Sequence, residues 1–164
     1  MRILIVKPSS LGDIIHALPT VNLLRRRYPG AHIAWLVNTT FTSLLKKCPV
    51  INECLPFHRH TPGTWLALRR QLRQQHFDLV VDLQGLFRSG LFTWFTGAPR
   101  RLGLSDAREA AGLFYNETVK VTATHAVDRY LHAAHHLGCE AGPIEFPLGL
   151  GPREPKGWIA VNAS

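Results

Sequence analysis

Cysteine, acidic residues and long apolar runs are all scarce in this 164-residue sequence. Its three cysteines, Cys48, Cys54 and Cys139, are odd in number and lack CxxC spacing, which disfavours a disulfide framework and favours a reducing compartment. The apolar run at residues 3–6 ends at Lys7 and is too short for a signal peptide or a membrane span. We therefore expect a cytoplasmic protein that does not cross a membrane.

The shortage of acidic residues leaves a strongly basic chain. Its 19 Lys and Arg residues stand against 11 Asp and Glu, which gives a net charge of +8. Such a charge favours association with polyanions, among them nucleic acids, phosphorylated sugars and anionic membrane surfaces. No nucleic-acid-binding motif is present, so we expect no nucleic-acid partner.

The common phosphate-binding motifs are missing as well, because neither GxGxxG nor GxxxxGKS/T occurs. In their place a short apolar strand leads through Ser9, Ser10 and Gly12 to Asp13, where a helical pattern begins. Ligands in open α/β sheets lie at the carboxyl ends of strands beside helix N-termini, so Asp13 is the leading candidate for chemistry. The alternative is that Asp13 only caps its helix.

Apolar runs and helical patterns alternate along the chain, which predicts a parallel α/β sheet with helices on both faces. Expected strands lie at residues 3–6, 32–37, 54–57, 77–83, 100–103 and 119–122. Expected helices lie at residues 14–27, 40–47, 61–75, 91–95 and 125–137. The loop at residues 84–90 repeats the strand-to-helix design of the first loop, so we expect a second site-building turn beside it.

One domain of residues 1–138 accounts for this alternation. Residues 139–157 contain four glycines and four prolines and are expected to form a linker. Residues 158–164 then predict the first strand of a further domain, so the chain is expected to stop just as that domain begins.

Histidines and cysteines gather at residues 54–60 and again at 132–139. Neither group has the spacing of a structural zinc site, which normally needs four well-spaced ligands, so we expect neither a metal nor a cofactor. Basic residues also gather on the third expected helix. Arg69, Arg70 and Arg73 are expected to form a solvated face there.

The aromatic residues at the fourth expected helix allow two interpretations. Phe87, Phe92, Trp94 and Phe95 are most simply part of the core. On an amphipathic helix they would also suit contact with acyl chains or a membrane surface. We take core as the expectation.

Four blocks of sequence point to a known family. They are residues 7–19 (KPSSLGDIIHALP), 82–89 (DLQGLFRS), 107–116 (AREAAGLFYN) and 125–129 (HAVDR). In these blocks, and in their order, the chain resembles the ADP-heptose:lipopolysaccharide heptosyltransferases of glycosyltransferase family 9, and most of all their heptosyltransferase I group. The resemblance spans essentially the whole chain.

The resemblance implies the N-terminal, Rossmann-like domain of a GT-B glycosyltransferase, in which two such domains face a cleft. The implied reaction is an inverting, metal-independent transfer of heptose from ADP-heptose to a Kdo sugar of the lipid A inner core. Such an enzyme would lie at the cytoplasmic face of the inner membrane. The donor would be bound mostly by the C-terminal domain, so this chain by itself is expected to be inactive.

The same resemblance implies roles for particular residues. Asp13 falls on the general base of the family. Ser9, Ser10 and Gly12 fall on acceptor-binding positions, where they shape the loop that holds Asp13 and let the acceptor hydroxyl approach. Acceptor binding is implied for three arginines as well, Arg59, Arg88 and Arg108, because the acceptor carries phosphates and carboxylates that guanidinium groups bind well.

Two other functions remain open. The chain could be a non-catalytic basic module that binds a phosphorylated ligand, since its charge fits that role equally well. It could also belong to a related glycosyltransferase that uses another core sugar as acceptor. The first loop would be shared in that case.

Overall fold

The computed structural model describes residues 1–57 and 64–149. A six-stranded sheet has the order β3-β2-β1-β4-β5-β6, and every neighbouring pair of strands is parallel. The strands are β1 (Arg2–Val6), β2 (His32–Asn38), β3 (Glu53–Phe57), β4 (Leu79–Asp82), β5 (Arg100–Leu104) and β6 (Glu117–Val119). The α-helices are α1 (Leu11–Arg27), α2 (Thr42–Leu45), α3 (Thr64–Gln74), α4 (Phe87–Phe95) and α5 (Ala126–His136), with 3-10 helices η1 (Thr39–Phe41) and η2 (Ala111–Phe114).

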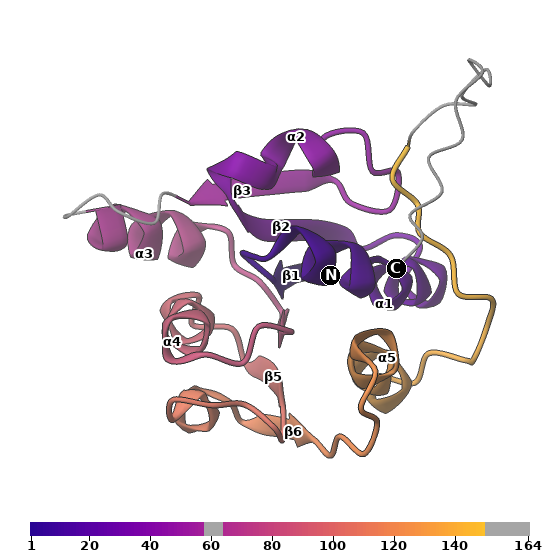
Figure 1. Cartoon of the computed structure of the whole chain (residues 1–164). Coiled ribbons are helices and arrows are strands. Elements are labelled where there is room, and N and C mark those ends of the chain that lie inside the picture. The colour runs from indigo at the N-terminus through magenta and orange to yellow at the C-terminus, as the bar shows by residue number, and fades with distance from the viewer. Residues whose placement is uncertain (58–63, 150–164) are drawn as a thin grey trace, which may run out of the picture.

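Helices cover both faces of the sheet, as the sequence predicts. Figure 1 shows α1 and α5 on one side of the strands and α3 and α4 on the other. Side chains alternate between these layers because successive strand residues point to opposite faces. Ile3 and Ile5 of β1 therefore pack toward α1 and α5, whereas Leu4 and Val6 pack toward α3 and α4.

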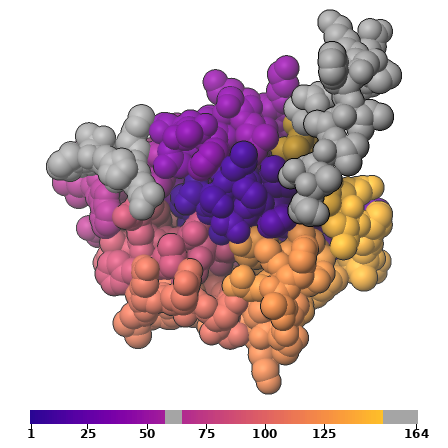
Figure 2. Space-filling view, viewed as in Figure 1, coloured from indigo at the N-terminus to yellow at the C-terminus, as the bar shows by residue number. Residues whose placement is uncertain are grey.

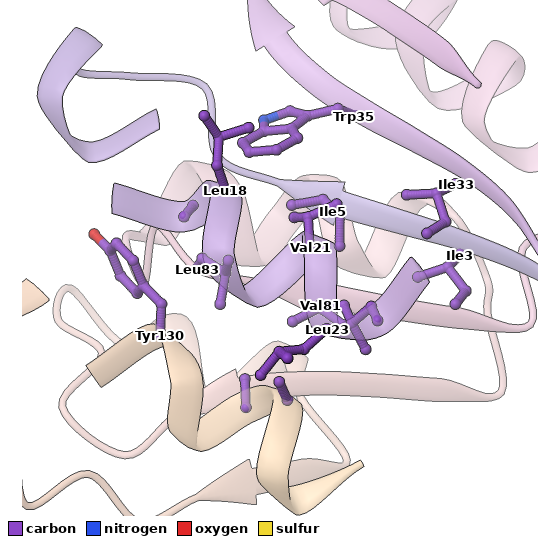
Figure 3. Packing of buried hydrophobic residues seen from close by; sticks show 14 of the residues in the cluster. Ile3, Ile5, Leu18, Val21, Leu23, Ile33, Trp35, Val81, Leu83 and Tyr130 are labelled. Atoms are coloured by element: carbon purple, nitrogen blue, oxygen red, sulfur yellow. The ribbon is translucent and has the colours of Figure 1, made fainter. Parts of the chain in front are cut away.

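The core is continuous around the central strands. Ile5 lies between Trp35 of β2 and Val81 of β4 in the register of the sheet. Figure 3 shows this layer, with Leu18 of α1 near Trp35 and Tyr130 of α5 at its margin. The central strands are buried on both faces, which explains their nearly unbroken apolar sequences.

Several boundaries differ from the sequence prediction. The expected helix 40–47 is split into η1 and the short α2, because the side chain of Asn38 accepts a hydrogen bond from Thr40 N and holds a tight turn. The expected strand 119–122 is displaced toward the N-terminus, since β6 spans Glu117–Val119 and shares only Val119 with the prediction. Val121 N instead donates to the hydroxyl of Ser105, which takes the chain out of the ladder. The 3-10 helix η2 was not predicted at all.

The aromatic prediction holds for only half of its residues. Phe92 and Phe95 of α4 are buried, but the side chains of Phe87 and Trp94 are about half exposed. These two residues are seven apart and therefore share one side of the helix, the side directed away from the sheet. The prediction of a solvated face on α3 is confirmed, since Arg69, Arg70 and Arg73 are all exposed, whereas Leu68 and Leu72 on the other face are buried.

Other features concern the ends of the domain. Residues 139–149 contain no helix or strand. Three predictions fall outside the described residues: the rest of the expected linker, the expected strand at 158–164, and the acceptor-binding role of Arg59. Among the helices that the structure describes, none is both long enough and apolar enough to cross a bilayer.

A buried carboxylate organises the carboxyl end of β4. Asp82 is fully buried and accepts hydrogen bonds from the amides of Gln84 and Gly85 and from the hydroxyl of Tyr115. Burial raises the pKa of Asp82, and these donors oppose that rise. Gly103 lies beside Asp82 in the register, and the Tyr115 ring crosses the place where a side chain at Gly103 would stand.

We predict that Gly103→Ala destabilises the domain. The new Cβ would lie 2.1 Å from the Tyr115 ring, so the tyrosine must move away from Asp82. Overpacking of this kind costs about 1–3 kcal/mol, which urea unfolding would measure. Gly112→Ala is the matched control, because its Cβ would meet nothing within 4 Å and its cost should stay below about 0.5 kcal/mol. Equal effects of the two substitutions would contradict the packing explanation.

Candidate functional site

The candidate site lies where the strand order reverses. β1 and β4 are neighbours, but β1 continues into α1 on one face of the sheet and β4 continues into α4 on the other. Their loops diverge and leave a crevice at the carboxyl edge, which is the usual ligand position in doubly wound sheets. Figure 2 shows the N-terminal segment between the β2–β3 segment and the later part of the chain, in line with this strand order.

The first loop is anchored to the neighbouring strand. The carbonyl of Lys7 accepts a hydrogen bond from the Trp35 indole at 3.1 Å, and the carbonyl of Pro8 accepts one from Asn38 N at 3.0 Å. Trp35 is itself fully buried. The backbone from which Lys7 and Ser9 project is therefore fixed by β2.

Lys7 is the central side chain of the site. It is only 2% exposed, and its ammonium lies 3.7 Å from Asp13 Oδ2. It also donates to Gln84 Oε1 at 3.3 Å and lies 5.3 Å from the centre of the Tyr130 ring. Burial lowers the pKa of Lys7, while the carboxylates of Asp13 and Asp82 oppose that fall.

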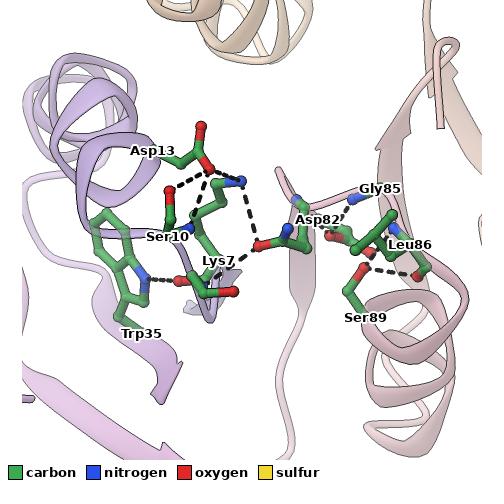
Figure 4. A network of polar contacts seen from close by, with 10 residues as sticks. Lys7, Ser10, Asp13, Trp35, Asp82, Gly85, Leu86 and Ser89 are labelled. Atoms are coloured by element: carbon green, nitrogen blue, oxygen red, sulfur yellow. Dashed lines mark hydrogen bonds and ion pairs between the residues drawn. The ribbon is translucent and has the colours of Figure 1, made fainter. Parts of the chain in front are cut away.

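Asp13 is held as an ionised carboxylate at the start of α1. Its Oδ2 accepts hydrogen bonds from Ser10 N at 3.1 Å and from the Ser10 hydroxyl at 2.9 Å. Partial burial works to raise the pKa of Asp13, but these bonds and the Lys7 ammonium outweigh it and hold the pKa below its usual value. Figure 4 shows the other carboxylate oxygen pointing away from these donors.

Asp13 opens into a small pocket of about 120 Å³. Lys7, Gln84, Arg108 and Tyr130 line it together with Asp13. Burial and the Asp13 carboxylate both raise the pKa of Tyr130, so its hydroxyl stays protonated at neutral pH. The amide of Arg108 donates to the carbonyl of Gly85 at 2.8 Å, which places the exposed arginine at the rim.

A second pocket of about 200 Å³ adjoins the first. Its lining includes Ser9, Gln84, Arg88 and Glu109. Gln84 lines both pockets, and its Oε1 also accepts from Ser9 N at 3.4 Å. The crevice thus has a carboxylate compartment and a neighbouring compartment that carries its own arginine.

The structure separates the predicted site residues into groups. Asp13 and Arg108 share one pocket, Ser9 and Arg88 share the other, and Ser10 acts on Asp13 directly. At Gly12, in the first turn of α1, a Cβ would meet nothing within 4 Å, so the fold itself does not require a glycine there.

Sequence reasoning did not assign Lys7, Gln84 or Tyr130 to the site. A charged residue directly after a buried strand was the signal for Lys7. For Gln84 the signal is the expected second site-building turn at residues 84–90, whereas Tyr130 has none, because only the fold brings α5 to the first loop. In residues 1–57 and 64–149, no three His, Cys, Asp or Glu side chains are grouped to hold a metal ion.

Comparison with known proteins agrees with this arrangement. The family model of glycosyltransferase family 9 (heptosyltransferase) matches residues 65–156, which is more than half of the chain. The chain belongs to this family. Lipopolysaccharide heptosyltransferase 1 of Pseudomonas aeruginosa is 34% identical over 162 residues, covering 90% of this chain and 44% of that protein. The Escherichia coli K12 heptosyltransferase 1 is 32% identical, covering 79% of this chain and 45% of that protein.

Solved structures give the same result. The E. coli heptosyltransferase WaaC with ADP-2-deoxy-2-fluoro heptose has a TM-score of 0.80 at 28% identity, covering 90% of this chain and 52% of that chain. E. coli ADP-heptose lps heptosyltransferase II has a TM-score of 0.71 at 25% identity, covering 90% of this chain and 46% of that chain. The fold is therefore the α/β fold of the GT-B heptosyltransferases. This chain spans about half the length of these relatives.

We predict that Lys7→Met raises the pKa of the Asp13 carboxyl. The substitution removes the ammonium that favours the ionised form and keeps an apolar stem of similar length in the buried site. NMR titration of the Asp13 carboxyl carbon should therefore show a midpoint at higher pH than in the wild type.

The control for this titration is Lys46→Met, at the exposed end of α2. It should leave the Asp13 midpoint in place. An unchanged midpoint in Lys7→Met would mean that Ser10 alone holds the carboxylate ionised. The same interaction has a stability consequence: because the pKa of Asp13 is depressed in the folded state, its contribution is present above about pH 4 and is lost as the pH falls through the folded value.

Proposed function

We propose that this chain is the acceptor-binding half of an inverting heptosyltransferase that moves heptose from ADP-heptose to Kdo of the lipid A inner core. Asp13 is the general base in this proposal. The observation that carries it is the placement of an ionised carboxylate, paired with the buried Lys7, at the crevice between β1 and β4. Membership of family 9 supports the class of reaction.

The geometry suits late proton transfer to Asp13. As the bond between the heptose and ADP lengthens, the attacking acceptor hydroxyl becomes acidic, so a carboxylate of low basicity can take its proton. Ser10 and Lys7 hold Oδ2, which leaves the second carboxylate oxygen for that hydroxyl. Tyr130 would stay protonated throughout and could donate to the acceptor.

The basic side chains suit an acceptor with phosphates and carboxylates. Arg108 lies at the rim of the Asp13 pocket and Arg88 lines the adjoining one, so an extended acceptor would meet both. Guanidinium groups bind such anions in bidentate fashion. Arg59 would extend this acceptor side in the family pattern. The donor would be held by the part of the family fold that this chain does not contain, and the enzyme would work at the cytoplasmic face of the inner membrane.

The test is Asp13→Asn in a chimera in which this chain replaces the matching part of the P. aeruginosa relative. Loss of a general base typically lowers kcat by about 100- to 10,000-fold. Acceptor affinity should stay within about twofold, because asparagine keeps the size of the side chain. Transfer is measured with ADP-heptose and a deacylated Kdo-lipid A acceptor.

Asp128→Asn is the matched control. Asp128 is an exposed aspartate at the third position of α5, as Asp13 is at the third position of α1. It should transfer heptose at the wild-type rate. Asp13→Asn activity within tenfold of the wild type would remove Asp13 from the role of base. A wild-type chimera that binds acceptor and transfers nothing would favour a non-catalytic binding module.

A further inference from the structure

Three helical segments lie side by side on one flank of the sheet. α3, α4 and η2 form a column there, with α4 in the middle and in contact with both neighbours (Figure 1). This column, called the α4 flank below, has a one-sided charge. Its residues 64–74, 87–95 and 111–114 include four arginines, Arg69, Arg70, Arg73 and Arg88, and no aspartate or glutamate.

The α4 flank also exposes large apolar side chains. Leu66 of α3 is 73% exposed, Trp94 of α4 is 48% exposed and Leu113 of η2 is 83% exposed. Phe87 lies on the same side of α4 as Trp94 and is also exposed. A monomeric soluble domain rarely gathers so many exposed apolar side chains on one face without a partner.

Direct contacts join these side chains into one surface. The Arg69 guanidinium lies 5.7 Å from the Trp94 ring, which links α3 to α4. The rings of Phe87 and Phe114 are 5.4 Å apart, which links α4 to η2. The apolar groups and the arginines are therefore interleaved across the flank.

We propose that the α4 flank binds the surface of an anionic lipid bilayer. Arginines would contact lipid phosphates, while Trp94, Leu66 and Leu113 would enter the boundary between headgroups and acyl chains. This combination of cationic and large apolar side chains is the one that holds peripheral proteins on such membranes. A second copy of the chain fits the flank less well, because residues 64–74, 87–95 and 111–114 supply arginines and no carboxylate. Glu109 lies at the edge of the flank, where its carboxylate accepts a hydrogen bond from Phe87 N.

The α4 flank lies next to the acceptor crevice. Arg88 is in the first turn of α4 and lines the same pocket as Ser9 and Gln84, and the exposed Phe87 precedes it. A bilayer on this flank would thus lie at the mouth of the acceptor crevice, where a lipid-linked sugar could reach it. This last step rests on the proposed function, whereas binding to the bilayer does not.

The experiment is cosedimentation of the chain with vesicles of phosphatidylcholine alone or with about 30% phosphatidylglycerol, at low and high salt, with neither donor nor acceptor present. We expect binding to the anionic vesicles only, weakened by salt. Each arginine near an anionic surface contributes about fivefold, so the triple variant R69Q/R70Q/R73Q should bind about 100-fold more weakly. L66S/W94S should also lose binding at unchanged net charge.

The control K46Q/K47Q/K120Q removes three equally exposed charges away from the flank. It should bind nearly as the wild type does, and so should Asp13→Asn, which separates this test from that of the proposed reaction. Equal weakening by both triple variants would overturn the proposal, since net charge alone would then explain binding. Equal binding to neutral vesicles would overturn it too, as would concentration-dependent self-association that L66S/W94S abolishes.

Discussion

A buried ammonium at the end of the central strand holds this site together. Lys7 is almost completely buried, and a buried charge is tolerated only when partners compensate it. The partners come from three places in the sequence: Asp13 at the start of α1, Gln84 after β4 and the ring of Tyr130 on α5. These contacts with Lys7 therefore position the Asp13 carboxylate and hold the first loop, the loop after β4 and α5 together around the crevice.

At the end of the neighbouring strand, β4, a buried acidic side chain plays a similar part. Asp82 lies beside Val6 in the sheet, and its buried carboxylate gathers two loop amides and the Tyr115 hydroxyl. Lys7 thus orders the loop after β1 and Asp82 orders the loop after β4. Two buried side chains, the Lys7 amine and the Asp82 carboxyl, position the walls of the crevice before any ligand arrives, and preorganisation of this kind is what a transferase site needs.

The architecture follows from sequence pattern because alternating apolar strands and helices leave few topologies open. Asp13 could be found for the same reason, since a small-residue loop after a buried strand marks a ligand edge. The turn that carries Gln84 could be placed beside the first loop as well, but the contacts of Gln84 and Tyr130 with Lys7 depend on strand order rather than on spacing. The exposure of Phe87 and Trp94 could not be predicted from the sequence either, since an aromatic residue looks the same there whether it faces the core or solvent.

Titration of the chain with a soluble, deacylated Kdo-lipid A acceptor, with ADP in parallel, tests most directly whether the crevice between β1 and β4 binds the acceptor. The account predicts that the acceptor binds, that ADP does not, and that Arg108→Ala weakens acceptor binding by about tenfold, the loss of one charge-assisted hydrogen bond. Binding of ADP without binding of the acceptor would contradict it, because this half of the fold would then serve the donor.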